Sequence, residues 1–211
     1  VAARSAGGRD EREGITLFLV PGDAPGVTRT RTIMVDSRNA AIVTLTGVSV
    51  GQEAVLGRVD GGADLLDRVL DRARAGLAAE MLGSAQEAFE RTVQYLKDRK
   101  QFGVAIGSFQ ALKHRAAQMF CEVEITRSAV MAATAALDEG ANDAALLASL
   151  AKAKASETFY LCGNEGVQMH GGIGMTDEHE IGFFMKRARV AQATFGDAAF
   201  HRDRYAALSG Y

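Results

Sequence analysis

The sequence of 211 residues has almost no excess charge of either sign, with a formal charge of −2 at pH 7. No basic cluster stands out, so neither a nucleic acid nor a membrane surface is expected as a partner. The longest apolar runs, such as residues 144–151, are far too short to cross a bilayer. No charged segment followed by an apolar one opens the chain, as a secretory signal would. These absences favour a cytoplasmic protein.

Cysteine is nearly absent. Cys121 and Cys162 lie far apart and do not have the spacing of metal ligands. No metal site is therefore expected. Both cysteines lie in apolar, helix-like surroundings, which predicts reduced and buried thiols.

Proline is confined to Pro21 and Pro25, and most β-branched residues also precede residue 60. This part predicts three strands, at Ile15–Val20, Val27–Val35 and Ala41–Val50. Helices follow the strands as a group, which is an α+β order and not the alternation of a parallel doubly wound sheet. We assign residues 1–58 to a partial β-domain.

The first residues of the chain, 1–13, are polar and lack an initial methionine. They look like the loop of a hairpin whose first strand is absent. That pattern favours a fragment or a processed chain, and a flexible tag is the alternative.

From Gly62 onward the chain has no proline, and apolar residues recur at three- and four-residue steps. Long helices joined by short turns are typical of an antiparallel bundle. We therefore predict a mainly α fold, in which residues 59–211 form a four-helix-type bundle preceded by a small antiparallel β remnant. The expected landmarks are a first helix ending near Gly103, a second closed by Gly140, a third capped by Asp143, and shorter helices at Glu180–Gln192 and Ala198–Leu208.

The first segment suited to chemistry is Asp98–Gly103, followed by Gln110. Its cationic residues have a simple interpretation, which is that they cap the carbonyl-rich end of a helix. The functional interpretation is that the guanidinium of Arg99 and the ring of Phe102 face a phosphate and a flat heterocycle.

The second segment, Gln168–Thr176, has three glycines in four positions. It either ends a helix or packs against a ligand that approaches the backbone closely. No strand precedes it, so it is not a dinucleotide-binding fingerprint of the βαβ type. His170 is expected to be a structural hydrogen-bonding residue.

The third segment is Phe195–Phe200, which opens the last helix. Asp197 either caps that helix or places a carboxylate in a cleft. The charged residues of Asp64–Arg74 are expected to form a solvated helix face.

Together these segments resemble the acyl-CoA dehydrogenase family, in family order from about Gly14 to Arg204. The stretch that contains Arg99, Phe102, Gly103 and Gln110 is similar to the family's R-x-x-F-G-x-x-I-x-x-F-Q-type segment. Two further stretches are similar to its Q-x-x-G-G segment and to its late β-domain, respectively Val167–Gly174 and Gly14–Pro21 with Pro25–Val27.

The resemblance implies FAD as the cofactor, an acyl-CoA substrate, and a homo- or hetero-oligomer formed through the bundle. In the family, an arginine and an aromatic residue reach across the subunit interface to the neighbour's FAD. The residues expected to bind FAD here are Arg99, Gln101, Phe102, Gln110, Gln168, Gly171, Gly172 and Asp197.

The resemblance also implies α,β-dehydrogenation of an acyl-CoA thioester, in which a carboxylate removes the α-proton. In most members that glutamate precedes the glycine of a Y-E-G-T-like segment, and Phe195 stands there in this sequence. A minority place it on the first bundle helix, where this chain has Ala73. Asp71 and Arg74 match the family's D-x-x-R spacing and are weak candidates for substrate binding.

The empty base positions leave three interpretations. The chain is one subunit type of a hetero-oligomeric dehydrogenase whose partner holds the base. Alternatively it uses another carboxylate, with Asp197 the nearest candidate and Glu80 a distant one. The third interpretation is a relative with different flavin chemistry or a purely structural role.

Overall fold

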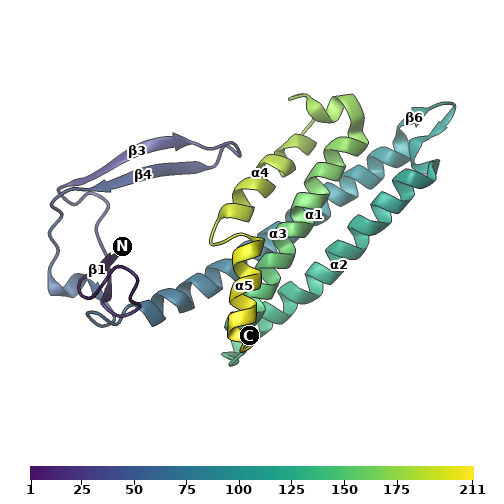
Figure 1. The fold of residues 1–211 in the computed structure, drawn as a ribbon. Helices are drawn as coiled ribbons and strands as arrows, with labels where there is room; N and C mark the ends of the chain where they lie inside the picture. The colour runs from purple at the N-terminus through teal and green to yellow at the C-terminus, as the bar shows by residue number, and fades with distance from the viewer. The chain divides into compact units, whose positions relative to one another are not determined.

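A computed structural model describes all 211 residues and divides them into two compact units, Val1–Leu70 and Asp71–Tyr211. The long helix α1 (Ala63–Asp98) begins in the first unit and continues into the second. Figure 1 shows the elements of both units in chain order, and each unit is described by itself.

The first unit contains a three-stranded antiparallel sheet in the order β1-β2-β5, formed by Ala2–Arg4, Ile15–Phe18 and Val55–Leu56. The expectation of an absent first strand was wrong, because β1 pairs with β2 and places Ala3 opposite Thr16. The loop between them folds around Arg4. Its guanidinium donates hydrogen bonds to the backbone carbonyls of Ala6, Arg9, Glu11 and Glu13.

A second antiparallel pair, β3 (Val27–Ile33) and β4 (Asn39–Leu45), forms a two-stranded ribbon. β4 ends five residues earlier than predicted, because the chain turns where Gly47 adopts a φ of 63°. A short 3₁₀ turn at Gln52–Ala54 leads back to β5.

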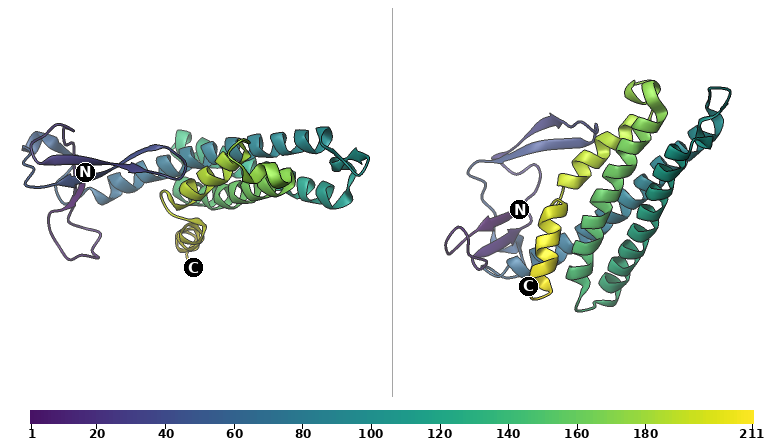
Figure 2. Two further views of the ribbon diagram at one scale, coloured as in Figure 1. Left: turned by 90° about the horizontal axis from the view of Figure 1, so that it is seen from above. Right: turned by 45° about the vertical axis from the view of Figure 1, so that its right-hand side comes forward.

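The second unit is an antiparallel bundle, which confirms the predicted mainly α fold. Its helices after α1 are α2 (Gln110–Glu139), α3 (Ala144–His170), α4 (Ile181–Ala193) and α5 (Ala198–Leu208). α3 packs against α2, α4 and α5, and Figures 1 and 2 show α2 and α3 side by side along their length.

Small and flexible side chains fill the core of this bundle. Ala85 and Met81 of α1, Met119 of α2, and Ala155 and Phe159 of α3 all belong to one buried cluster. Alanines let helix axes approach closely, and methionines fill the remaining irregular space.

The two cysteines have different environments. Cys162 is buried, and burial raises the pKa of its thiol to about 12. The prediction of a buried Cys121 was wrong, because Cys121 lies on the outward face of α2, between the buried residues Met119 and Val123.

The helix ends agree only partly with the predictions. Gly140 closes α2 in the left-handed conformation, with φ 67°, as expected for a glycine at this position. Asp143 precedes α3, but its side chain makes no capping hydrogen bond. Instead its backbone carbonyl accepts a hydrogen bond from the N–H of Leu147. No helix is long and apolar enough to cross a membrane.

Candidate functional site

The Arg99 segment contains the end of α1 and a tight hairpin that follows it. α1 ends at Asp98, five residues before Gly103, near which the first helix was expected to end, and β6 (Lys100–Gln101) pairs with β7 (Val104–Ala105). Phe102 and Gly103 form the turn, with φ values of 54° and 81°. Two consecutive positive φ values are typical of a two-residue hairpin turn. The turn leaves Phe102 89% exposed.

The glycine segment follows α3 directly. Gly171 has φ 65° and begins a 3₁₀ turn, Gly171–Met175. A Cβ on Gly171 or Gly172 would have no atom within 4 Å, whereas a Cβ on Gly174 would lie 2.6 Å from the carbonyl oxygen of Val167. Gly174 therefore permits internal packing, while Gly171 and Gly172 leave open space beside the backbone.

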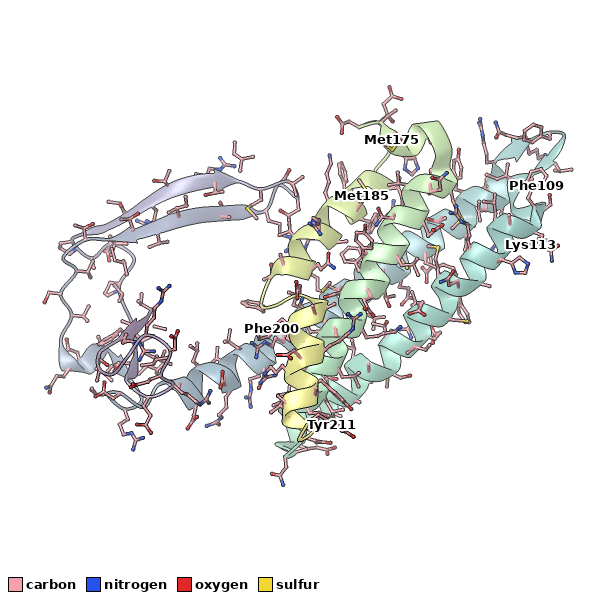
Figure 3. The ribbon with its side chains drawn as sticks, in the orientation of Figure 1. Phe109, Lys113, Met175, Met185, Phe200 and Tyr211 are labelled. Carbon is pink, nitrogen blue, oxygen red and sulfur yellow. The ribbon has the colours of Figure 1, made fainter.

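These two segments line one cavity of about 600 Å³ at the end of the bundle. Of the residues expected to bind FAD, Arg99, Gln101, Phe102, Gln168, Gly171 and Gly172 are at this cavity. Gln110 and Asp197 are not among its lining residues. Residues that were not expected to bind FAD complete the wall: Tyr95, Ile106, Phe109, Leu112, Arg115, Met169, His170 and Ile173. Figure 3 labels Phe109 near the hairpin at this end of the bundle.

The charges of this cavity have one sign. Arg99 and Arg115 line it, and no aspartate or glutamate does. The remaining wall is mostly aromatic and aliphatic. Two guanidinium groups, open glycine backbone and flat apolar surfaces suit a ligand that combines phosphate with a flat heterocycle. The residues present therefore fit FAD.

His170 belongs to the wall of the cavity but is held by the protein. Its Nδ1 lies 2.7 Å from the carbonyl oxygen of Gly166, and its ring packs at a tilt against Tyr95 and His179, with centroids 4.3 Å and 4.4 Å apart. Burial lowers the pKa of His170, against the hydrogen bond to Gly166 that raises it. These contacts support the expected structural role.

The turn that contains Phe195 is a second place where polar groups gather. Phe195 and Gly196 have φ values of 60° and 104°. The carbonyl of Phe195 lies 3.3 Å from Nε of Arg74, which donates to it, and 3.1 Å from Nε2 of His201. The carbonyl of Gly196 accepts a hydrogen bond of 2.9 Å from Nζ of Lys152. The turn is thus fixed through its main chain.

Burial shapes the titration of this cluster. Lys152 and His201 are fully buried. Desolvation lowers the pKa of Lys152 to about 8, partly offset by Asp197. Desolvation, followed by the charge of Lys152, lowers the pKa of His201 to about 4. His201 is therefore neutral at pH 7 and donates through Nε2 to Phe195, while Nδ1 has no hydrogen-bond partner.

Asp71 and Arg74 are buried, so the expected solvated helix face was wrong at these two positions. Asp71 pairs with Arg74 at 2.9 Å and with Arg204 at 2.9 Å. Arg204 also donates to the hydroxyl of Ser149. Buried charges need such partners because isolated ones are costly. Neither Asp71 nor Arg74 lines the cavity, and a role in substrate binding stays a prediction.

The carboxylates considered as replacement bases are both engaged. Asp197 caps α5, because its Oδ1 accepts a hydrogen bond of 2.8 Å from the N–H of Phe200. Oε1 of Glu80 accepts one of 2.7 Å from Nε of Arg187. Ala73 and Phe195 provide no proton acceptor.

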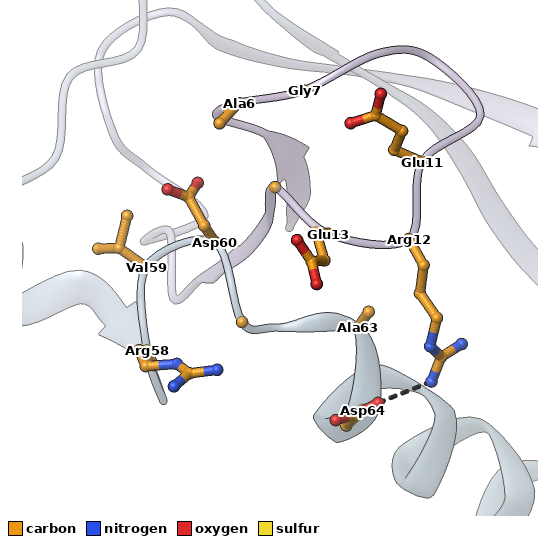
Figure 4. A pocket seen from close by; sticks show the side chains of 12 residues that line it. Ala6, Gly7, Glu11, Arg12, Glu13, Arg58, Val59, Asp60, Ala63 and Asp64 are labelled. Atoms are coloured by element: carbon orange, nitrogen blue, oxygen red, sulfur yellow. Dashed lines mark hydrogen bonds and ion pairs between the residues drawn. The ribbon is translucent and has the colours of Figure 1, made fainter.

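A cavity of about 580 Å³ also lies within the first unit, and Figure 4 shows its lining side chains. Charges of both signs line it, including Glu11, Arg12, Glu13 and Asp64. Arg12 is paired with Asp64 at 2.8 Å, and this hydrogen bond is the main cause of its raised pKa. None of the residues expected to bind FAD is here, so the bundle cavity is the better candidate site.

Comparison with known proteins gives one consistent family. The profile of the acyl-CoA dehydrogenase C-terminal domain matches residues 60–208. The short/branched chain specific acyl-CoA dehydrogenase of Bos taurus is 33% identical over 84% of this chain and 42% of its own length. This chain therefore spans less than half the length of that relative.

Two solved structures show the same relationship. Butyryl-CoA dehydrogenase from Megasphaera elsdenii is 27% identical with a TM-score of 0.92, over 98% of this chain and 55% of that one. A variant of the Tcur3481–Tcur3483 steroid ACAD is 34% identical with a TM-score of 0.83, over 99% of this chain and 54% of that one.

Proposed function

This chain belongs to the acyl-CoA dehydrogenase family, and from that premise we propose that it supplies FAD-binding surface to an acyl-CoA dehydrogenase assembled from two subunit types. The observation that carries the proposal is the bundle cavity. It joins the Arg99 hairpin and the Gln168–Gly172 segment, which are distant in sequence, around a space lined by arginines and open glycines.

Each part of this cavity has a role toward FAD. Arg99 offers a planar set of donors to the diphosphate, and Gly171 and Gly172 allow backbone approach to the nucleotide. Phe102 and Phe109, whose rings meet edge to face at 6.0 Å, present apolar surface to a flat ring. Bound FAD would supply the hydride acceptor for α,β-dehydrogenation of an acyl-CoA.

The base for this reaction is proposed to come from the partner subunit. Proton abstraction needs an acceptor within hydrogen-bond reach of the α-carbon proton. Phe195 cannot accept a proton, and Asp197 is already occupied as a helix cap. The name of the similar Tcur3481–Tcur3483 steroid ACAD joins two protein designations, which fits an assembly of two chain types.

The bundle is the proposed surface of assembly. Phe120, Ile125 and Met131 of α2 are each more than half exposed. Exposed apolar side chains on a helix favour association with another protein surface. The family resemblance implies the same interface.

The proposal is tested by co-purifying the full-length protein with its native partner and recording the visible flavin spectrum. We expect FAD in the complex and dehydrogenation of acyl-CoA that depends on the partner. Arg99→Ala should weaken FAD binding by about 1–3 kcal/mol, the usual scale for a charge-assisted hydrogen bond. A complex without flavin would instead support the structural role.

A further inference from the structure

The bundle cavity contains a second guanidinium, Arg115 of α2, which was not among the residues expected to bind FAD. We propose that Arg115 binds the diphosphate of the ligand together with Arg99, so that two guanidinium groups share two phosphates. This inference rests on the function proposed above, and it adds a binding residue and its support, Glu165, to that site.

The first argument is how Arg115 is held. Its Nε lies 3.2 Å from Oε2 of Glu165, whose side chain is largely buried. The contact is an ion pair without hydrogen-bond alignment, because Oε2 of Glu165 has no hydrogen-bond partner. The carboxylate therefore attracts the guanidinium without accepting a hydrogen bond from it, and the N–H groups remain available to a ligand. Such a positioned fork of donors suits bidentate binding of phosphate.

The second argument is a contrast with other arginines of the bundle. Arg127, on the same helix, donates to Gln86 and pairs with Glu124. Arg204 donates to the backbone carbonyl of Ala145 as well as to Asp71. These guanidinium groups donate hydrogen bonds to protein acceptors, whereas the ion pair of Arg115 with Glu165 is not a hydrogen bond. The bundle cavity that Arg115 lines has no acidic lining residue.

The third argument is position along the groove. A neighbouring cavity of about 490 Å³ shares Arg115, Gln168, Gly171 and Gly172 with the first. It is also lined by Glu165, the partner of Arg115, and extends to Met175 and Met185, both labelled in Figure 3. The shared residues therefore lie between two spaces. A dinucleotide has its diphosphate in the middle and a ring system at each end, so a cation at the junction matches the negative centre of such a ligand.

The test uses the full-length protein in its complex with the native partner, stripped of flavin and titrated with FAD. We expect Arg115→Gln to raise the Kd for FAD by about 10- to 100-fold, the range for a lost charge-assisted hydrogen bond. Arg115→Lys keeps the charge but lacks the fork, so its Kd should lie between those of the wild type and Arg115→Gln. Glu165→Gln should weaken binding less than Arg115→Gln. Arg127→Gln is the matched control on α2 and should leave the Kd unchanged.

Titration with ADP and AMP distinguishes failure of the proposed role of Arg115 from failure of the proposed function. Calorimetric titration with ADP and AMP should show that Arg115→Gln weakens ADP binding more than AMP binding. Loss of FAD affinity in Arg99→Gln with none in Arg115→Gln would overturn the role of Arg115 and leave the proposed function intact. A wild-type complex that binds ADP but no flavin would overturn the proposed function and leave the diphosphate site. Binding of neither FAD nor ADP would overturn both.

Discussion

At the scale of single residues, the glycines of the second segment divide into two kinds. Gly174 has protein atoms where a side chain would lie, and Gly172 has open space. We therefore expect Gly174→Ala to destabilise the protein by about 1–3 kcal/mol, the usual cost of overpacking. Gly172→Ala should leave stability within about 0.5 kcal/mol but weaken FAD binding. Thermal unfolding and FAD titration of both variants measure these effects. Equal destabilisation by the two substitutions would contradict the distinction between a packed Gly174 and an open Gly172.

His201 gives a prediction about pH. Its pKa is lowered to about 4 in the folded protein, against about 6.5 in an unfolded chain. The unfolded state therefore binds more protons between these values, so stability falls as pH drops from 6.5 toward 4. In His201→Asn this protonation effect should disappear, so the free energy of unfolding should fall by about 1–3 kcal/mol less between pH 7 and pH 4.5 than in the wild type. Denaturant unfolding at pH 7 and pH 4.5 compares the two proteins, and identical pH profiles would rule out the assigned burial effect.

At the scale of elements, periodicity predicted the bundle helices well because their buried residues recur at helical spacing. The Arg99 hairpin was not predicted, because Phe102 adopts a positive φ that its residue type gives no reason to expect. Arg115 was also not predicted to bind the ligand, because the case for it depends on an ion pair with Glu165, and the two residues lie on different helices, α2 and α3. Burial of Cys121 was mistaken because residues of an apolar helix can face outward.

Helix caps provide a matched pair at this scale. Asp197 caps α5 through its side chain, whereas Asp143 occupies the same kind of position before α3 without a capping hydrogen bond. Asp197→Ala should cost about 0.5–2 kcal/mol, and Asp143→Ala less than about 0.5 kcal/mol. Chemical denaturation of the two variants is the measurement. A larger loss in Asp143→Ala would mean that the cap assignment is reversed.

The exposed apolar residues of α2 give a prediction about assembly. A carboxylate at Ile125 or Met131 places charge where apolar surface is proposed to be buried. Ile125→Asp and Met131→Asp should therefore shift the protein toward smaller species in sedimentation while the helical circular dichroism remains. Leu208→Asp, at an exposed apolar position of α5, is the control. Unchanged sedimentation of the α2 variants would place the interface elsewhere.

At the scale of the whole molecule, the chain spans about half the length of its solved relatives. We expect that this chain alone does not dehydrogenate acyl-CoA, because Phe195 and Ala73 leave no base and loss of general-base catalysis costs about 10²- to 10⁴-fold in rate. A dye-reduction assay with a panel of acyl-CoAs, with and without the partner, measures this. Asp197→Asn is the suitable variant because asparagine also caps helices. If the chain turns over substrate without the partner, and this turnover disappears in Asp197→Asn but not in Glu80→Gln, then Asp197 is the base.

The anchoring of the Phe195 turn by its main chain has a consequence for exchange of its side chain. Arg74, His201 and Lys152 bind the carbonyls of residues 195 and 196, and none of these hydrogen bonds involves the side chain at 195. The positive φ of Phe195 disfavours β-branched residues at this position. Unbranched side chains of different chemistry can therefore replace one another there while the same hydrogen bonds hold the backbone, so the shape of this turn is separable from the reactivity that it presents.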